Sequence, residues 1–245
     1  MAKKILTKLC ILAPALLLLT ASRTDEEKAR EIDTSKTIVY VFDIRDDIGK
    51  PSWRVMSEAF REAESLKADY ILLHLNTYGG IVNIADSMRT RILNSHIPVL
   101  AFIDNQAISA GALISIACDS IYMRRGGNIG AATVVDQTGS VVPDKYQSFM
   151  RSTMRATAES HGKDTIISGN DTLIKWRRDP RIAEAMVDPT IVAEGIDDSS
   201  KVLTFTAEEA IANGYCEGLA NNIIEVLKVA GIKEYELVVY KPSGV

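Results

Sequence analysis

The sequence contains few of the residues that build metal centres and disulfide scaffolds. Only three cysteines and three histidines occur among its 245 residues, with no CxxC pair and no closely spaced histidines. Zinc sites and cysteine-stapled folds depend on such spacings, so no metal site or other cofactor is predicted. Cys118 and Cys216 each lie in an apolar stretch, where a free cysteine behaves as a small buried hydrophobic residue.

Runs of basic residues are also missing. The net charge is -4, and no cluster of Lys and Arg interleaved with aromatic residues occurs, which argues against a nucleic-acid-binding surface. With 47% hydrophobic and 24% charged residues, the composition is that of a globular protein large enough to bury a core within one domain.

One uninterrupted apolar run stands at the N-terminus, over residues 9–19. Lysines precede it and small residues follow it, which is the layout of a secretory signal. The run is shorter than the ~20 residues that span a bilayer as a helix. We therefore predict a signal peptide over residues 1–21 and an exported, periplasmic or otherwise extracytoplasmic protein, with an uncleaved membrane anchor as the alternative. Residues 22–36 are polar without an apolar period and predict a linker.

Strand-like and helix-like segments alternate from Thr37 onward. The β-branched run 37–44 predicts a strand, and apolar residues at three- and four-residue steps from Trp53 to Ala63 predict an amphipathic helix. The further expected elements are a strand at 70–75, a helix at 82–93, a strand at 98–103, a helix from about Ser109, a strand at 202–205, a helix after the capping box Thr206/Glu209, a helix at 221–229 and a strand at 235–240. This alternation predicts an α/β fold with a mainly parallel sheet, formed by one domain over residues 37–245.

Adjacent glycines follow the second predicted strand, in the segment Asn76-Thr77-Tyr78-Gly79-Gly80. Without side chains in the way, their backbone N–H groups can approach a developing negative charge, as an oxyanion hole requires. Taken alone, the segment is also typical of an ordinary strand-to-helix turn.

Ser109 lies at the next junction between a strand and a helix. A serine at this position usually caps the helix. Its neighbours Ala107, Ala110 and Gly111 are small enough for a substrate backbone to approach, and a helix N-terminus stabilises an anionic intermediate. Ser109 is therefore the candidate nucleophile, whereas Ser115 projects from another side of the helix and is expected to pack in the core.

Lys145, at the predicted start of a later helix, is the candidate general base. A lysine acts as a base only where burial lowers its pKa, a change that arginine does not undergo. Histidine is the usual base for serine, but His74 lies in a strand, His96 in a connection and His161 at a helix end. Elimination thus favours a Ser/Lys dyad over a Ser/His/Asp triad, and a solvated surface lysine is the alternative.

Together these segments resemble the ClpP-like serine peptidases, and most closely the NfeD-type membrane-bound serine protease domain. The likeness covers roughly residues 37–241. It rests on segments 76–80, 108–111 with Asp119, 128–132, 185–189 and 203–210, which occur in the same order as in that family.

The resemblance implies a ClpP/crotonase-like fold and a serine endopeptidase. It assigns Ser109 as the nucleophile and Lys145 as the dyad lysine, with the backbone N–H groups of Gly79, Gly80 and Ala110 as the oxyanion hole. Substrates of the family are hydrophobic segments of membrane-associated, stomatin-like proteins, and the resemblance also implies a homo-oligomer, a dimer or larger.

Two further points concern the lysine and its neighbours. In ClpP itself the catalytic histidine follows the segment that corresponds to residues 130–131, whereas Thr133 and Val134 occupy that neighbourhood here. Tyr146 and Phe149, next to Lys145, are candidates for a substrate-binding or subunit surface, and a buried helix face explains them equally well.

Two other functions remain open from the sequence. The first is a catalytically silent scaffold that binds a membrane protein partner through the same groove, because a fold does not by itself fix an activity. The second is an acyl-CoA enzyme of the related crotonase fold, which uses the same paired N–H groups, although no CoA-directed feature is found.

Overall fold

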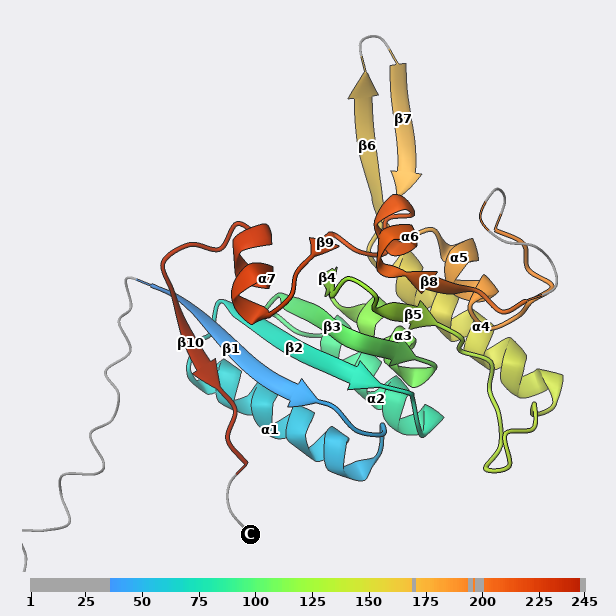
Figure 1. Ribbon diagram of the computed structural model, residues 1–245, viewed down its shortest axis with the longest axis horizontal. Helices are drawn as coiled ribbons and strands as arrows, with labels where there is room; N and C mark the ends of the chain where they lie inside the picture. The colour runs from blue at the N-terminus through green and yellow to red at the C-terminus, as the bar shows by residue number, and fades with distance from the viewer. Residues whose placement is uncertain (1–35, 169–170, 194–195, 197–200, 243–245) are drawn as a thin grey trace, which may run out of the picture. The chain divides into compact units, whose positions relative to one another are not determined.

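The computed structural model describes residues 36–168, 171–193, 196 and 201–242, and its centre is a mostly parallel β-sheet (Figure 1). The main path of the sheet is β10-β1-β2-β3-β4-β9, in which all neighbours are parallel. β5 pairs parallel with β3 and antiparallel with β8. The strands are β1 (Thr37–Ile44), β2 (Tyr70–Thr77), β3 (Val99–Ile108), β4 (Ser120–Met123), β5 (Asn128–Gly130), β8 (Thr204–Thr206), β9 (Gly218–Leu219) and β10 (Tyr235–Val239).

Helices lie on both faces of this sheet. Figure 1 shows α1 and α2 below the sheet and α7 above it. The helices are α1 (Lys50–Ser65), α2 (Val82–Leu93), α3 (Ala110–Ala117), α4 (Asp144–Glu159), α5 (Pro180–Ala185), α6 (Ala207–Ala212) and α7 (Ile223–Val229). The predicted α/β architecture is therefore confirmed.

The central strands are apolar along almost their whole length because both faces are covered. Residues 38–42, 71–75 and 99–103 are buried throughout, as expected for parallel strands between two layers of helices. On the α1 side, Met56 and Phe60 are fully buried, which confirms the helical period read from the sequence. On the other side, α7 contributes to a cluster with β1, β2 and β3.

A two-stranded hairpin, β6 (Lys163–Ser168) and β7 (Asp171–Trp176), forms a separate small sheet that the sequence analysis did not predict. Its side chains are largely exposed and its apolar residues occur on both faces, so no buried period marks it. In Figure 1 the hairpin extends away from the sheet, between α4 and α5 in the chain.

The expected signal peptide (1–21) and all of the expected linker except Lys36 lie outside the described residues. Within the described part of the chain, no helix is long and apolar enough to cross a membrane. Cys118 and Cys216 are free and buried, so the expectation of two small hydrophobic residues is confirmed.

Candidate active site

Ser109 sits where β3 turns into α3, in a backbone conformation that is rare for a residue with a side chain. Its φ is 56° and its ψ is -117°, while the helix that follows is buried along its whole length. Such a conformation costs about 1–3 kcal/mol and persists only where the surrounding structure enforces it. The strained turn places the half-buried serine beside the cavity at the helix N-terminus, where the first backbone N–H groups lack intrahelical acceptors.

The two glycines after β2 form the other side of this turn. A Cβ atom added to Gly79 would lie 2.7 Å from Ser109 Cβ and 3.2 Å from its Oγ, so only glycine leaves room for the serine. A Cβ atom added to Gly80 would lie 2.2 Å from the carbonyl oxygen of Ile48. Gly79 packs against Ser109, Ala110 follows it in the chain, and Gly80 and Ala110 line the same cavity as Ser109, so the structure brings the three predicted oxyanion-hole residues close to the serine.

The N–H groups of these residues are not equally free. That of Gly79 donates to the hydroxyl of Thr77 at 3.1 Å. Gly80 and Ala110 line the cavity beside Ser109, and Ala110 is the first residue of α3. Gly80 and Ala110 are therefore better placed than Gly79 to donate to an oxyanion.

Strand β5 supports Ser109 through a backbone hydrogen bond. The N–H of Ser109 donates to the carbonyl oxygen of Gly130 at 2.9 Å. The N–H of Ala131, the residue after Gly130, donates to the carbonyl oxygen of Leu203 at 3.0 Å. Gly130 packs so closely on β8 that an added Cβ atom would lie 2.5 Å from the Leu203 carbonyl oxygen. Segment 128–132, one of those that carry the family resemblance, therefore positions the serine.

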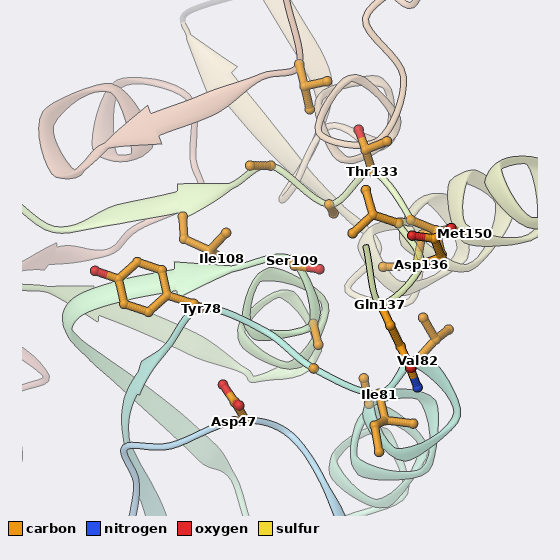
Figure 2. Close-up of a pocket in the computed structure, with 18 residues that line it drawn as sticks. Asp47, Tyr78, Ile81, Val82, Ile108, Ser109, Thr133, Asp136, Gln137 and Met150 are labelled. Carbon is orange, nitrogen blue, oxygen red and sulfur yellow. The ribbon is translucent and has the colours of Figure 1, made fainter. Parts of the chain in front are cut away.

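A cavity of about 810 Å³ opens beside Ser109, within the size range of ligand sites. In Figure 2 the serine lies at its centre, with Tyr78 and Ile108 on one side and Thr133, Asp136 and Met150 on the other. Most of the lining is apolar, and its larger aliphatic and sulfur-containing side chains are Ile81, Val82, Ile108, Val134, Val135, Met150 and Val202. The cavity suits an apolar polypeptide better than a charged small molecule.

The charged residues among those that line the cavity are Asp47 and Asp136. Neither was singled out in the sequence, because no motif marks an aspartate in a connection. The hydroxyl and N–H of Thr138, together with the N–H of Ser140, hold the pKa of Asp136 below its usual range. This carboxylate is therefore ionised at neutral pH.

Lys145 begins α4 as predicted, but its side chain is exposed and is not among the residues that line the cavity. Its Nζ lies 4.7 Å from the centre of the Tyr146 ring. Tyr146 and Phe149 are about half exposed, at 50% and 54%, whereas Met150 is buried and lines the cavity. Tyr146 and Phe149 therefore do not belong to a buried face of α4, which was the alternative explanation for them.

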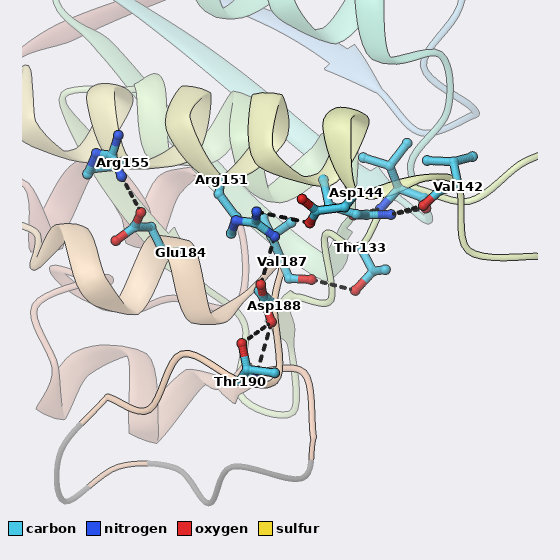
Figure 3. Close-up of polar contacts among 11 residues, drawn as sticks. Thr133, Val142, Asp144, Arg151, Arg155, Glu184, Val187, Asp188 and Thr190 are labelled. Atoms are coloured by element: carbon cyan, nitrogen blue, oxygen red, sulfur yellow. Dashed lines mark hydrogen bonds and ion pairs between the residues drawn. The ribbon is translucent and has the colours of Figure 1, made fainter.

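Polar contacts fix the segment between β5 and α4, which forms the wall of the cavity (Figure 3). The buried Gln147 accepts from Val134 N at 3.0 Å and donates to Val134 O at 2.7 Å. Thr133 donates to the Val187 carbonyl at 2.8 Å. Arg151 pairs with Asp144 at 3.1 Å and with Asp188 at 2.7 Å, so the first turns of α4 are tied to the chain after α5.

None of the three histidines lines the cavity. His74 lies between Asp43 and Asp104 on β1 and β3, with its ring stacked on Phe102. His161 contacts the far end of α3. Among the described residues, no group of three or more His, Cys, Asp or Glu side chains is arranged to hold a metal ion.

Comparisons with known proteins match most of the described chain. The model of the family described as "NfeD1b, N-terminal domain" matches residues 38–239. Membrane protein NfeD1b from Bacillus subtilis (strain 168) is 34% identical over 209 residues, which cover 85% of this chain and 44% of that protein. Membrane-bound protease PH1510 from Pyrococcus horikoshii is 28% identical over 202 residues, or 79% of this chain and 40% of that protein. The chain thus spans less than half the length of these two relatives.

Solved structures show the same fold. The 1510-N membrane-bound stomatin-specific protease, as a lysine-to-alanine mutant in complex with a substrate peptide, aligns with a TM-score of 0.68 and 26% identity over 85% of this chain and 94% of its own. A serine-to-alanine mutant of that protease gives the same TM-score and identity over 85% and 99%. ClpP1 from Listeria monocytogenes aligns with a TM-score of 0.53 and 16% identity over 79% and 94%. The fold is therefore ClpP-like, as predicted.

Proposed function

Because the chain belongs to the NfeD1b N-terminal domain family, we propose that it is a serine endopeptidase with Ser109 as the nucleophile and Lys145 as the general base. The observation that carries the proposal is the strained Ser109, which packs against Gly79 and lines an apolar cavity together with Gly80 and Ala110. The relatives of known structure support it, since one is a protease solved both as a serine-to-alanine and as a lysine-to-alanine mutant.

In the proposed reaction, Lys145 Nζ removes the proton from Ser109 Oγ, which attacks the peptide carbonyl. The N–H groups of Gly80 and Ala110 donate to the oxyanion, and the lysine passes its proton to the leaving amine. Water then releases the acyl group from Ser109 by the same steps. For this chemistry the lysine leaves the Tyr146 ring and enters the groove, where a bound apolar peptide excludes water and favours the neutral amine.

The proposed substrates are hydrophobic segments of a membrane-associated, stomatin-like protein. The apolar lining of the cavity supports this class, as does the stomatin-specific protease among the relatives. Tyr146 and Phe149, exposed beside Lys145, are proposed to contact the substrate at the rim. The export signal would place the reaction outside the cytoplasm, and a homo-oligomer is expected from the resemblance.

The test is cleavage of apolar peptides by the purified protein, followed by mass spectrometry. Ser109→Ala and Lys145→Ala are each expected to abolish cleavage, and Lys145→Arg is expected to be inactive too, because arginine keeps the charge but not the base. Lys163→Ala is the matched control, since Lys163 is also exposed and its Nζ lies 4.2 Å from the centre of an aromatic ring. Full activity of Lys145→Arg would reject the dyad.

The exposure of Lys145 outside the cavity favours one other candidate, a catalytically silent scaffold that binds a membrane protein through this groove. That function predicts unchanged partner binding by Ser109→Ala and no acylation of wild-type Ser109 by a serine-reactive fluorophosphonate probe. Labelling of the wild type, lost in Ser109→Ala, would reject the scaffold.

A further inference from the structure

A second hollow adjoins the cavity of Ser109 and shares two of its lining residues. It has a volume of about 630 Å³ and is lined by the end of β1, the start of α1 with the connection before it, and the end of β2. Asp47 and Tyr78 line both hollows. In Figure 2 these two residues lie on the same side of Ser109, and Asp136 lies on the other. A peptide that extends from the apolar cavity past Tyr78 therefore enters the second hollow.

The second hollow is acidic, whereas the cavity is mostly apolar. Its charged lining residues are Asp43, Arg45, Asp46 and Asp47. Three carboxylates against one guanidinium leave a net charge of -2, and Arg45 Nε already lies 3.3 Å from Asp43 Oδ2. Within the described part of the chain, no hydrogen bond or ion pair engages the carboxylate of Asp46 or Asp47. A carboxylate of this kind binds an ammonium or guanidinium group through charge-assisted hydrogen bonds.

The ring of Tyr78 is an independent feature that favours a cation. Its side chain is 75% exposed, and among the described residues no ring stacking or cation–π contact engages it. The face of an aromatic ring attracts lysine and arginine side chains. An exposed ring alone would suit an apolar side chain as well. Asp47, which lines the same two hollows, makes a basic side chain the better fit.

Asp47 has a fixed position relative to the proposed oxyanion hole. The N–H of Ile48 donates to the Gly79 carbonyl at 2.7 Å, and the N–H of Ile81 donates to the Ile48 carbonyl at 2.8 Å. Gly80 packs so closely on Ile48 that an added Cβ atom would lie 2.2 Å from its carbonyl oxygen. These contacts fix the backbone next to Asp47 and leave its side chain available to a ligand. A side chain on such a rigid support can set specificity.

We propose that Asp47 and Tyr78 bind a lysine or arginine side chain of the substrate, so that the protein selects an apolar segment bordered by a basic residue. This inference rests on the proposed function of the cavity. Apolar residues next to the scissile bond occupy the cavity of Ser109, and the basic side chain enters the second hollow past Tyr78. Lysine and arginine flank many membrane-embedded segments, so this preference directs cleavage to the end of such a segment.

Peptides that share one apolar core and carry a single lysine at successive positions on either side of it test the preference. At the position that reaches the second hollow, lysine is expected to raise kcat/KM about ten-fold over glutamine, and glutamate is expected to lower it. Asp47→Lys is expected to invert the order of the three peptides, because it places a cation in the hollow. Equal cleavage of the three peptides by the wild type, or the wild-type order in Asp47→Lys, would overturn the proposal.

Two further comparisons separate local contacts from the charge of the whole protein. Glu159→Lys makes the same change of charge at the exposed end of α4, away from both hollows, and is expected to keep the wild-type order. Tyr78→Phe retains the ring and is expected to retain the lysine preference, whereas Tyr78→Leu is expected to reduce it about three-fold. The same preference in both Tyr78 variants would overturn the role of the ring.

Peptide binding to Ser109→Ala distinguishes this inference from the proposed protease activity. That variant forms no acyl-enzyme, so fluorescence anisotropy of labelled peptides measures recognition alone. About ten-fold tighter binding of the lysine peptide than of the glutamine peptide, lost when Asp47→Asn is added, would support the inference even if the wild type cleaves neither peptide. Circular dichroism verifies that the variants are folded. Equal affinity for the two peptides would overturn the inference even if the wild type cleaves both.

Discussion

The two ends of helix α3 differ in how their backbone groups are satisfied. At the N-terminal end, Ser109 is strained and faces an open cavity. At the C-terminal end, the buried Arg178 donates to the carbonyls of Ile116 and Cys118 at 3.1 and 2.7 Å, and His161 Nε2 lies 2.6 Å from the first of these. A cation at a helix C-terminus satisfies the last carbonyls and favours the helix dipole. The C-terminal end of α3 is thus capped by side chains of the protein itself (the closed end), whereas the N-terminal end opens to the cavity and can accept a ligand (the open end).

The largest expected effect is on the closed end. Arg178→Met removes a guanidinium that is only 3% exposed, and with it the hydrogen bonds to the Ile116 and Cys118 carbonyls and the ion pair with Glu217. We expect the free energy of unfolding to fall by about 3 kcal/mol, measured by urea denaturation. Arg177→Met is the matched control, because Arg177 is exposed and its pair with Asp164 contributes little. Equal decreases in the free energy of unfolding of the two variants would show that the Arg178 contacts with the end of α3 do not stabilise the fold.

The open end is expected to be sensitive to added volume. Gly79→Ala places a Cβ atom against Ser109 and forces alanine to a φ of 117°. We expect the free energy of unfolding to fall by about 2 kcal/mol and peptide cleavage to be lost. Gly139 also has a positive φ, of 84°, but nothing lies within 4 Å of an added Cβ atom. Gly139→Ala is therefore expected to cost about 1 kcal/mol and to leave cleavage intact.

The closed end should also respond to pH. Burial, together with the charge of Arg178, lowers the pKa of His161 to about 4. Between that value and the ordinary pKa of about 6.5, the unfolded chain binds a proton that the folded chain does not, so stability falls as the pH is lowered. We expect the wild type to lose about 2 kcal/mol more free energy of unfolding than His161→Gln over this pH range, a value reduced because His161 is partly exposed. Urea denaturation at pH 7 and pH 4.5 measures the difference, and parallel curves for wild type and variant would contradict it.

The smallest expected effect is a gain in stability at the open end. Ser109→Gly relieves the strain at a φ of 56° and should raise the free energy of unfolding by about 1 kcal/mol. Ser109→Ala keeps the strain and should leave stability nearly unchanged, although both variants lack the nucleophile. If both variants have the same stability, the turn stores no strain.

Much of the fold could be predicted because burial leaves a period in the sequence. The helix at 82–93 and the strand at 37–44 have the predicted bounds. α1 begins at Lys50 rather than near Trp53, because its first turn carries Pro51 and few apolar residues. The hairpin β6–β7 was missed since both of its faces are exposed, and an element without a buried face leaves no such pattern.

Site residues could be predicted from the sequence where backbone conformation requires a particular residue type, but not where the direction of a side chain determines its position. Gly79 and Gly80 were found because only glycine permits their conformation and close contacts. Asp47 was missed, since its place beside the serine depends on how β1 and β2 end relative to each other. Lys145 lies at the predicted helix start, but the direction of a long, exposed side chain is set by no local rule. Its role as the base stays a prediction.

The support of Ser109 by β5 and β8 also sets the order in which a new chain acquires its reactive turn. The carbonyl that holds Ser109 belongs to Gly130, and the strand of Gly130 is completed by Thr204–Thr206, nearly 100 residues after the serine. During synthesis the serine therefore emerges long before the segment that completes its support, and bonds between such distant residues form late in folding. We therefore expect Ser109 to adopt its strained conformation, and with it any reactivity, only after the rest of the chain has been synthesised.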